Sequence, residues 1–500
     1  MNKNLFTCSI SILLVLAALL CGCQATPAAT VVASKNDGTL EAALEKTPEE
    51  EPAEATANAE EAADTDIAEA AGTKAEIYTY TESFSSMDGN ITYNVNVELP
   101  AVETDLPVLQ VTPHTITSAE AETIARAIFG DAEFYEYSTE KGKSEIEEEI
   151  LKLKQHISDR DVLVAYYGGN EETADEVIAD FESRISALEA LYETASETVE
   201  PTECNWQFHS ESYYTDPELG LSNDDYNQEL KAMVWIDGTP YVYVVYNRNA
   251  EDYRIHSIIA YIDDSLIPLS DKYRSDEITD TDITALLDTT NTVLEQMGMG
   301  DWEVEDYTVG EWEVEVGHTV RTLSIQVSPV YNGLKMLNVP QLANLKSEDA
   351  YASNYYYEKI GLNFSGGRLV DFGYDAPLDV VNVINPAVSI LSEDEIIASF
   401  KRQMTLDDIT GYQIEGIPEE LLDEVPQVTN VTATVDGVEL GLARTRIKNN
   451  ESDFYLLPAY LFRGSVNLTF SDGSSELIND TIFAVINAVD GTIINTDLGY

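Results

Sequence analysis

Two stretches decide the fold: Ile77-Tyr78-Thr79-Tyr80 and Ile91-Thr92-Tyr93-Asn94-Val95-Asn96-Val97. In both, apolar or aromatic residues alternate with polar ones, which is the period of a half-buried β-strand. Met87-Asp88-Gly89-Asn90 lies between them and supplies a turn. We therefore expect folded structure to begin near Glu76 with an antiparallel hairpin.

Helix-start signals follow at three places. In each of Thr117–Glu120, Thr279–Asp282 and Ser392–Glu395, a hydroxyl residue stands three positions before an acid, the spacing of a capping box. Apolar residues recur four and eight positions after each cap, and strand-like sequence follows. We expect an α+β fold of tandem units, each a helix plus a small antiparallel sheet, used about three times. Chance is the alternative explanation, because such caps are common.

A different pattern separates the first two units. Apolar residues repeat at helical spacing over 146–157 and again over 177–191, with a break at Gly168-Gly169-Asn170. This predicts an inserted helical hairpin over 140–198. Such an arm either binds a partner or packs on its own domain, and the second is the commoner case.

The N-terminus carries a targeting signal. Asn2-Lys3-Asn4 is weakly basic, and Leu5–Leu20 is a short apolar run typical of a secretory signal peptide. The run ends in Leu20-Cys21-Gly22-Cys23, which resembles the bacterial lipobox. The resemblance implies a signal peptide over 1–22, cleavage after Gly22 and lipidation of Cys23. An ordinary cleaved signal with a fortuitous cysteine is the alternative.

Lipidation implies a place in the cell. Two or three acyl chains, such as palmitate, hold a protein stably at a membrane where one chain does not. The resemblance therefore predicts a lipoprotein anchored at the outer, extracellular face of the bacterial cell membrane. Residues 23–75 follow; from Gln24 to Lys74 they hold three lysines, twelve acids and no aromatic residue. We expect a disordered acidic linker, with ends roughly 40 Å apart if it behaves as a flexible coil.

Charge and length bound the rest of the chain. Lys and Arg total 27 against 91 Asp and Glu, a formal charge of -64. This charge repels phosphate backbones, so no nucleic-acid partner is expected. A length of 500 residues fits two to four domains. We place them at 76–270, 271–390 and 391–500, after the linker.

Catalytic and metal-binding motifs are weak. The five histidines lie more than ten positions apart, so no zinc spacing such as His-Glu-x-x-His exists. Ser138-Thr139-Glu140-Lys141 fits the Ser-x-x-Lys motif of penicillin-recognising enzymes, but it lacks the companion motifs. Asp280-Thr281-Asp282 begins like a calcium loop and lacks the later ligands, so capping explains it better. Cys204 has no activating pattern and is read as a half-buried thiol near Trp206. We assign no catalytic residue, metal ligand or cofactor.

The C-terminal part has the most distinctive sequence. Phe454–Phe462 predicts a strand with Pro458 at an edge or strand start. Phe483–Ile494 predicts a hairpin that turns at Asp490-Gly491. This pairing resembles the C-terminal domains of YycI/YycH-type extracytoplasmic regulatory proteins and, more loosely, PepSY-like domains. The resemblance covers about 320–500, and more weakly 76–135.

That resemblance implies regulation by protein contact outside the membrane. YycI-like proteins act through an uncleaved membrane helix, and this chain is expected to have none after cleavage. We therefore favour a non-enzymatic lipoprotein whose sheet edges or grooves contact an extracytoplasmic protein.

The alternatives follow from composition. The first is a ligand-binding lipoprotein for a cationic peptide or a glycan, suggested by the acidic charge, by 28 tyrosines and by the cluster Tyr351, Tyr355, Tyr356 and Tyr357. The second is an envelope hydrolase, which requires a converging carboxylate pair in a deep cleft.

Overall fold

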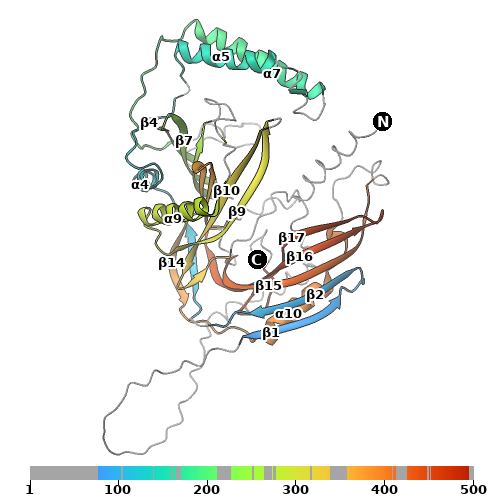
Figure 1. Ribbon diagram of the computed structural model, residues 1–500. Coiled ribbons are helices and arrows are strands. Elements are labelled where there is room, and N and C mark those ends of the chain that lie inside the picture. Colours follow the sequence, from blue (N-terminus) through green and yellow to red (C-terminus); the bar gives the residue numbers. More distant parts are fainter. Residues whose placement is uncertain are drawn as a thin grey trace, which may run out of the picture. The chain divides into compact units, whose positions relative to one another are not determined.

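The protein is an α+β protein in the computed structural model shown in Figure 1. The structure describes residues 77–102, 105–138, 140–158, 160, 163–164, 171–210, 227–250, 253–263, 273, 278–315, 318–337, 357–407, 409–412, 425–447, 450 and 452–494. The predicted signal peptide over 1–22, Cys23 and the linker over 23–75 lie outside these ranges. Within the ranges, no helix combines the length and the apolar character needed to cross a membrane.

The chain divides into two compact units, each assembled from separate stretches. The first takes the described residues of Pro113–Val330 and Tyr356–Leu378; the second takes those before Pro113, those of Tyr331–Tyr355 and those from Asp379 onward. This division differs from the expected consecutive domains at 76–270, 271–390 and 391–500. The cause is strand pairing between distant residues: Val431 pairs with Ile91, for example. Local sequence patterns carry no information on such pairs.

The first sheet has ten strands in the order β11-β10-β12-β13-β8-β7-β6-β4, with β5 added to β6 and β9 added to β10. All except β11 belong to the first unit. The strands are β4 (Phe134–Glu136), β5 (His209–Ser210), β6 (Asn227–Ile236), β7 (Thr239–Ala250), β8 (Tyr253–Ile262), β9 (Trp302–Glu315), β10 (His318–Tyr331), β11 (Leu334–Lys335), β12 (Lys359–Ser365) and β13 (Arg368–Asp375).

The apolar runs Val234–Ile236 and Tyr241–Val245 flank Asp237-Gly238 in the sequence and predict a hairpin, and the turn between β6 and β7 confirms it. Asp237 and Gly238 have φ values of 49° and 80° and form the two-residue loop that closes this hairpin. Positive φ at both positions is the mark of the tight hairpin turn that Asp-Gly favours.

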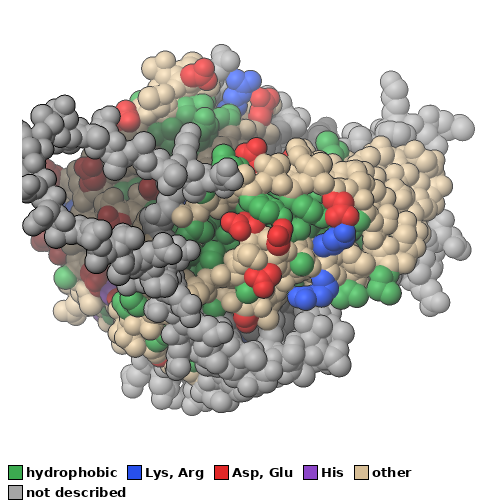
Figure 2. All heavy atoms as spheres, turned by 90° about the horizontal axis from the view of Figure 1, so that it is seen from below, with side chains coloured by type: hydrophobic (Ala, Val, Ile, Leu, Met, Phe, Trp, Pro, Cys, Tyr) green, Lys and Arg blue, Asp and Glu red, His purple; other side chains and the backbone are tan. Residues whose placement is uncertain are grey.

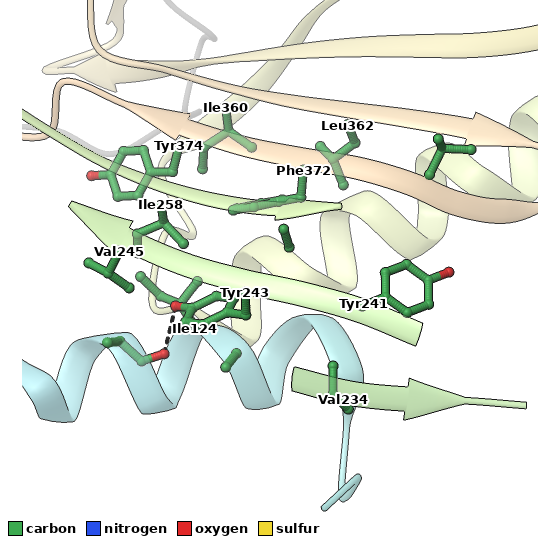
Figure 3. Close-up of a cluster of buried hydrophobic side chains, with 14 of the residues drawn as sticks. Ile124, Val234, Tyr241, Tyr243, Val245, Ile258, Ile360, Leu362, Phe372 and Tyr374 are labelled. Carbon is green, nitrogen blue, oxygen red and sulfur yellow. Dashed lines mark hydrogen bonds between the residues drawn. The ribbon is translucent and has the colours of Figure 1, made fainter. Parts of the chain in front are cut away.

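Helices α4 (Ser118–Phe129) and α9 (Asp280–Gln296) lie side by side in the first unit (Figure 1). Their apolar residues pack with those of β7 and β8 in one buried cluster (Figure 3). Tyr243 is fully buried, and its hydroxyl donates to the Ala121 carbonyl of α4 at 2.7 Å. This bond ties the helix to the sheet while satisfying the one polar atom of the ring.

The predicted capping boxes are confirmed. The Thr117 hydroxyl accepts from the Glu120 N–H at 3.3 Å, and the Glu120 carboxylate accepts from the Thr117 N–H at 2.8 Å. Thr279 and Asp282 repeat this arrangement at the start of α9. The third box begins α10 (Glu393–Leu406) in the second unit, at Ser392. The sequence thus marked three helix starts correctly.

The predicted hairpin is also confirmed, as α5 (Lys143–Ser158) and α7 (Glu171–Tyr192), which lie side by side (Figure 1). Lys143 pairs with Glu197 at 2.8 Å, and Lys154 pairs with Glu189 at 3.1 Å. Since the start of α5 meets the end of α7, the two helices are antiparallel. The proposed break at 168–170 lies outside the described residues.

The second unit is built on a seven-stranded sheet in the order β1-β2-β15-β16-β3-β14, with β17 also paired to β16. The strands are β1 (Tyr78–Ser85), β2 (Ile91–Leu99), β3 (Val108–Pro113), β14 (Leu378–Asn385), β15 (Val428–Arg446), β16 (Phe454–Phe470) and β17 (Ser475–Asn487). The β1–β2 hairpin is the one predicted, and β2 pairs parallel to β15. A short 3₁₀ helix, η2, spans Ile409–Tyr412.

Helix α10 covers one face of this sheet. Its buried residues include Phe400, which stacks on Phe462 of β16 with ring centroids 4.3 Å apart. Tyr93 of β2 and Val431 of β15 belong to the same buried cluster. The opposite face of β1 and β2 carries the polar residues of the alternating pattern.

The C-terminal predictions hold in part. The turn after β17 is confirmed, with Gly491 at a φ of 71° and Ile494 bonded back to Val485. The placement of Pro458 is wrong, because β16 has strand neighbours on both sides. Pro458 lies between the part of β16 that pairs with β3, up to Leu456, and the part that pairs with β17, from Ala459. Proline has no backbone N–H to donate, so it is tolerated where the hydrogen-bond ladder on one side of a strand is interrupted.

Candidate functional site: an exposed apolar edge strand

Strand β14 presents apolar side chains to solvent on both of its faces. Val380, Val381, Val383 and Ile384 are 44%, 52%, 51% and 36% exposed. Because successive residues of a strand point to opposite faces, exposure of adjacent residues means that neither face is covered. Isolated exposed apolar residues are ordinary, but a continuous group of this kind makes β14 a candidate contact surface.

The position of β14 in its sheet adds a second feature. It ends the path of described strands, after β3. An edge strand offers backbone N–H and C=O groups for pairing, and proteins usually block such edges with lysine, proline or a bulge. Residues 380–384 contain no charged residue and no proline. The edge formed by β14 therefore has the composition of a strand that pairs readily with another strand.

The start of β14 is firmly held. The Leu378 N–H donates to a carboxylate oxygen of Glu358 at 3.1 Å, and the Tyr374 hydroxyl donates to the same oxygen at 3.0 Å. Glu358 is only 3% exposed. The preceding carbonyl, of Pro377, accepts from the His114 N–H at 2.8 Å. A buried carboxylate and a backbone bond thus fix the point where the strand begins.

The end of β14 is held in the same manner. Asn385 is buried, and its side-chain oxygen accepts from the Ala387 N–H at 2.9 Å. Shortly after, the Val388 N–H donates to the Leu106 carbonyl at 2.9 Å. Both ends of the exposed segment are therefore fixed before any partner arrives, which lowers the entropy lost on pairing.

Cys204 lies where the sequence placed it. Its side chain is half-buried and packs with Trp206 against the core of the first unit, and its N–H donates to the Phe134 carbonyl. Burial raises the pKa of the thiol, and a hydrogen bond from the backbone of Trp206 opposes the shift only in part. A raised pKa leaves less thiolate, so this geometry supports no nucleophile.

The Ser-x-x-Lys motif is not assembled. The Ser138 hydroxyl accepts from the Glu140 N–H at 3.1 Å, whereas the ammonium of Lys141 forms an ion pair with Glu149 of α5. Thr139 lies outside the described residues. The serine therefore has no basic neighbour in Lys141 that could activate it.

Candidate metal ligands are dispersed as well. Across the described part of the chain, no three His, Cys, Asp or Glu side chains come close enough to hold a metal ion. Asp282 caps α9, as expected. His256 is buried, and its Nδ1 lies 3.0 Å from the Asn247 side-chain oxygen, which also accepts from the Ile116 N–H. These contacts hold the buried His256 ring in the interior of the first unit.

The tyrosine argument for a ligand site is weakened by burial. Tyr357 is 3% exposed, and Tyr93, Tyr243 and Tyr460 are among the largest fully buried side chains. Tyr351, Tyr355 and Tyr356 lie outside the described residues. These four buried tyrosines, Tyr93, Tyr243, Tyr357 and Tyr460, are therefore core residues.

Comparisons with known proteins add little. No protein-family model matches the chain, and no curated protein matches it. Among solved structures, the chain is similar to an uncharacterized protein from Eubacterium rectale, with 10% sequence identity, a TM-score of 0.40 and coverage of 80% of this chain and 90% of that one. A likeness of this size carries no functional argument, and the resemblance to YycI/YycH-type domains stays a prediction.

Sequence reasoning missed β14. Its residues, Leu-Asp-Val-Val-Asn-Val-Ile-Asn, are rich in β-branched side chains, and this composition signals a strand. Nothing in the composition says that the strand is exposed, since such runs are normally buried.

Proposed function

We propose that this protein is a lipoprotein, anchored by Cys23 at the outer face of a bacterial cytoplasmic membrane, that acts by non-enzymatic contact with another extracytoplasmic protein. The partner adds an extended segment to β14. The observation that carries the proposal is the uncovered apolar edge over 380–384, held at both ends.

The chemistry of the edge defines the partner segment. Strand addition gives affinity through backbone hydrogen bonds and specificity through alternate side chains. Eight residues of β14 span about 25 Å at the usual rise of a strand. A matching segment is therefore about eight residues long and carries apolar side chains on both faces of its strand opposite Val380, Val381 and Val383.

Charge argues against a second copy of this chain as the occupant. Each copy carries a formal charge of -64, and like charges of that size oppose association. A neutral or basic partner meets no such repulsion. The apolar edge is thus suited to a different protein.

The test compares partner recovery between two lysine variants. Val383→Lys places a charge on β14, and Met87→Lys places one at an exposed turn, where Met87 is 77% exposed. Each full-length protein is purified in detergent from membranes of its host, and co-purified proteins are quantified by mass spectrometry. We expect wild type and Met87→Lys to retain one stoichiometric partner and Val383→Lys to lose at least nine-tenths of it.

Two outcomes contradict the proposal. One is recovery of no stoichiometric partner with wild type, or equal recovery with all three proteins. The other is a wild-type dimer in sedimentation velocity that becomes a monomer in Val383→Lys, which makes the second copy the occupant.

The anchor has its own test. Cys23→Ala removes the only thiol that the lipobox reading assigns to the acyl chains, so the mature protein should move from the membrane fraction to the soluble extracellular fraction. Retention of Cys23→Ala in the membrane fraction contradicts lipid anchoring while leaving the β14 contact untouched.

A further inference from the structure

Two glycines face each other in the middle of the first sheet. Gly361 of β12 pairs directly with Gly373 of β13. Both strands are interior strands, because β10 lies beyond β12 and β8 lies beyond β13. Glycine weakens the interior of a strand, so a facing pair of glycines is costly for the fold and calls for an explanation.

The fold itself does not require either glycine. Neither has a positive φ, and a Cβ added at either position would meet no atom within 4 Å. Gly441 of β15 differs, because a Cβ there would lie 2.6 Å from the Lys335 carbonyl oxygen. A glycine within a strand also marks a place where a ligand or another backbone approaches closely. The chain leaves that space open at Gly361 and Gly373, so both residues are suited to contact a ligand.

The two glycines lie on the outer face of the first sheet, which we define as the face turned away from the core cluster beneath α4 and α9. Their neighbours in the strands, such as Leu362 and Phe372, belong to that cluster (Figure 3). The outer residues alternate with these and are half-buried: Lys359, Gly361 and Asn363 on β12, and Asp371, Gly373 and Asp375 on β13. Because the two glycines lack side chains, the centre of this group is open down to the backbone.

One carboxylate stands on each side of Gly373 along β13. Asp371 and Asp375 are each two residues away from it, about 7 Å at the usual rise of a strand. Asp371 accepts from the Asn363 side-chain amide at 2.7 Å, and the Asn363 side-chain oxygen accepts from the Ser324 hydroxyl. These bonds fix one carboxylate beside the open backbone, and a carboxylate has acceptor positions for further donors.

The second carboxylate is only partly compensated by a cation. Burial raises the pKa of Asp375, and the charge of Lys359, its partner across the strands, opposes this shift only in part. A further cation beside Asp375 would stabilise its charged form. The formal charge of -64 on the whole chain also favours a cationic ligand.

The shape of the site selects the kind of cation. A guanidinium is planar, so it can lie flat on the open backbone of Gly361 and Gly373 and direct its N–H donors to carboxylates at its edges. An ammonium is a compact point charge and gains nothing from a flat surface. Tyr261 of β8 is 37% exposed and lies opposite Asp371, so an aromatic ring is also available for contact with a cation.

We propose that the outer face of β12 and β13 binds an arginine side chain of a basic peptide, whose guanidinium lies over Gly361 and Gly373 between Asp371 and Asp375. Acidity alone does not mark the site, because acidic side chains also lie among exposed apolar ones in the view of Figure 2. The open glycine pair between two carboxylates is the feature that distinguishes it. This inference does not depend on strand addition at β14.

The test is fluorescence anisotropy of a labelled peptide in which two arginines are separated by glycine and serine, titrated with the purified full-length protein at physiological salt. Two further peptides replace each arginine by lysine or by citrulline, which has the shape of arginine and no charge. We expect the arginine peptide to bind, the lysine peptide to bind about fivefold more weakly, and the citrulline peptide not to bind.

Gly373→Val covers the open backbone without disturbing the fold, since a Cβ there meets no atom within 4 Å. It should weaken binding of the arginine peptide about tenfold, while the thermal unfolding midpoint stays at or above that of wild type, because valine is the better strand former. Gly300→Val is the matched control, at an exposed glycine before β9 with equally open surroundings. It should bind the arginine peptide as wild type does.

A second pair of variants tests the charge. Asp375→Asn should weaken binding about fivefold, whereas Asp288→Asn, at an exposed position of α9, should leave it unchanged. The inference is overturned if wild type binds none of the peptides, or if the lysine or citrulline peptide binds as tightly as the arginine peptide. It is also overturned if folded Gly373→Val binds as wild type does, or if Asp375→Asn and Asp288→Asn lose equal affinity.

Val383→Lys separates this site from the proposed function. It should bind the arginine peptide as wild type does, because β14 takes no part in the site. Loss of the β14 partner with intact peptide binding would affect only the proposed function.

Discussion

β1 and β14 are the two end strands of one path of paired strands, and they differ in which of their residues are exposed to solvent. Every second residue of β1 is exposed, and each of these is Thr or Ser; the residues between them are half-buried. In β14, Asp379–Ile384 are all exposed, and four of these six residues are Val or Ile. The first edge shows the alternation of a half-buried strand, and the second shows none.

Contacts on the inner side of β1 explain its alternation. The Tyr78 hydroxyl donates to Asp394 at the start of α10, and Lys401 of the same helix pairs with Glu82. The Lys401 ammonium also lies 5.4 Å from the ring centroid of Phe84. Helix α10 therefore protects one side of β1, while hydroxyl residues face water on the other.

The contrast with β1 shows that an edge strand of this sheet does not need exposed apolar residues. The same sheet shows how such an edge is protected, with alternation, ion pairs and a covering helix. Strand β14 lacks the alternation and has no charge over 380–384. A feature that the fold does not require, and that invites association, supports the proposed partner contact.

The largest expected effect comes from weakening the protection of β1. Phe400→Ala removes a fully buried ring from the α10 core and its stacking on Phe462. Loss of this burial and the cavity left behind should lower the free energy of unfolding by about 3–5 kcal/mol. Urea unfolding followed by fluorescence measures the change.

Leu406→Ala is the matched control on the same helix, because Leu406 is 56% exposed. It should change the free energy of unfolding by less than about 0.5 kcal/mol. Equal losses for Phe400→Ala and Leu406→Ala would show that α10 does not cover β1 as described.

A smaller effect is expected where β14 begins. Glu358→Ala leaves the Leu378 N–H and the Tyr374 hydroxyl without their buried acceptor, so the free energy of unfolding should fall by about 1–3 kcal/mol. Amide hydrogen exchange at Leu378 should become faster at the same time. Glu303→Ala, at an exposed position of β9, is the control and should change neither quantity. Unchanged exchange at Leu378 in Glu358→Ala would mean that this carboxylate does not hold the strand.

The sequence predicted those parts of the fold that depend on neighbours in the chain. Capping boxes at Thr117, Thr279 and Ser392, the Asp237-Gly238 turn and the α5–α7 hairpin follow from local geometry, and all are present. The arrangement into two units was beyond such reasoning. It depends on pairings such as Val431 with Ile91, whose free energy comes from burial that a local pattern does not reveal.

The candidate surfaces show the same limit. Gly361 and Asn363 alternate with apolar residues in the sequence, which places them on one face of a strand. That Gly373 and Asp371 lie opposite them required the register of β12 and β13. For β14, composition predicts burial, and only the folded structure shows the exposure of Val381 and Val383.

The smallest effect concerns the charges that protect β1. Hydrogen bonds from Lys401 and, to a lesser degree, from Tyr80 lower the pKa of Glu82 below its ordinary value of 4.5. A carboxylate with a lowered pKa in the folded state stabilises that state above its unfolded pKa, and the contribution is lost as the pH falls through the folded value. Glu82→Gln should therefore lower the thermal unfolding midpoint slightly at pH 7, and the difference from wild type should shrink as the pH falls below 4.5.

Asp379→Asn tests the other edge in the same experiment, because Asp379 is the one charged residue of β14. Removing that charge brings the edge closer to a wholly apolar strand, so concentration-dependent association should increase while the unfolding midpoint stays close to that of wild type. If Glu82→Gln instead produced association and Asp379→Asn did not, β1 would be the edge that needs its charge to stay unpaired, and the contrast between the two strands would be reversed.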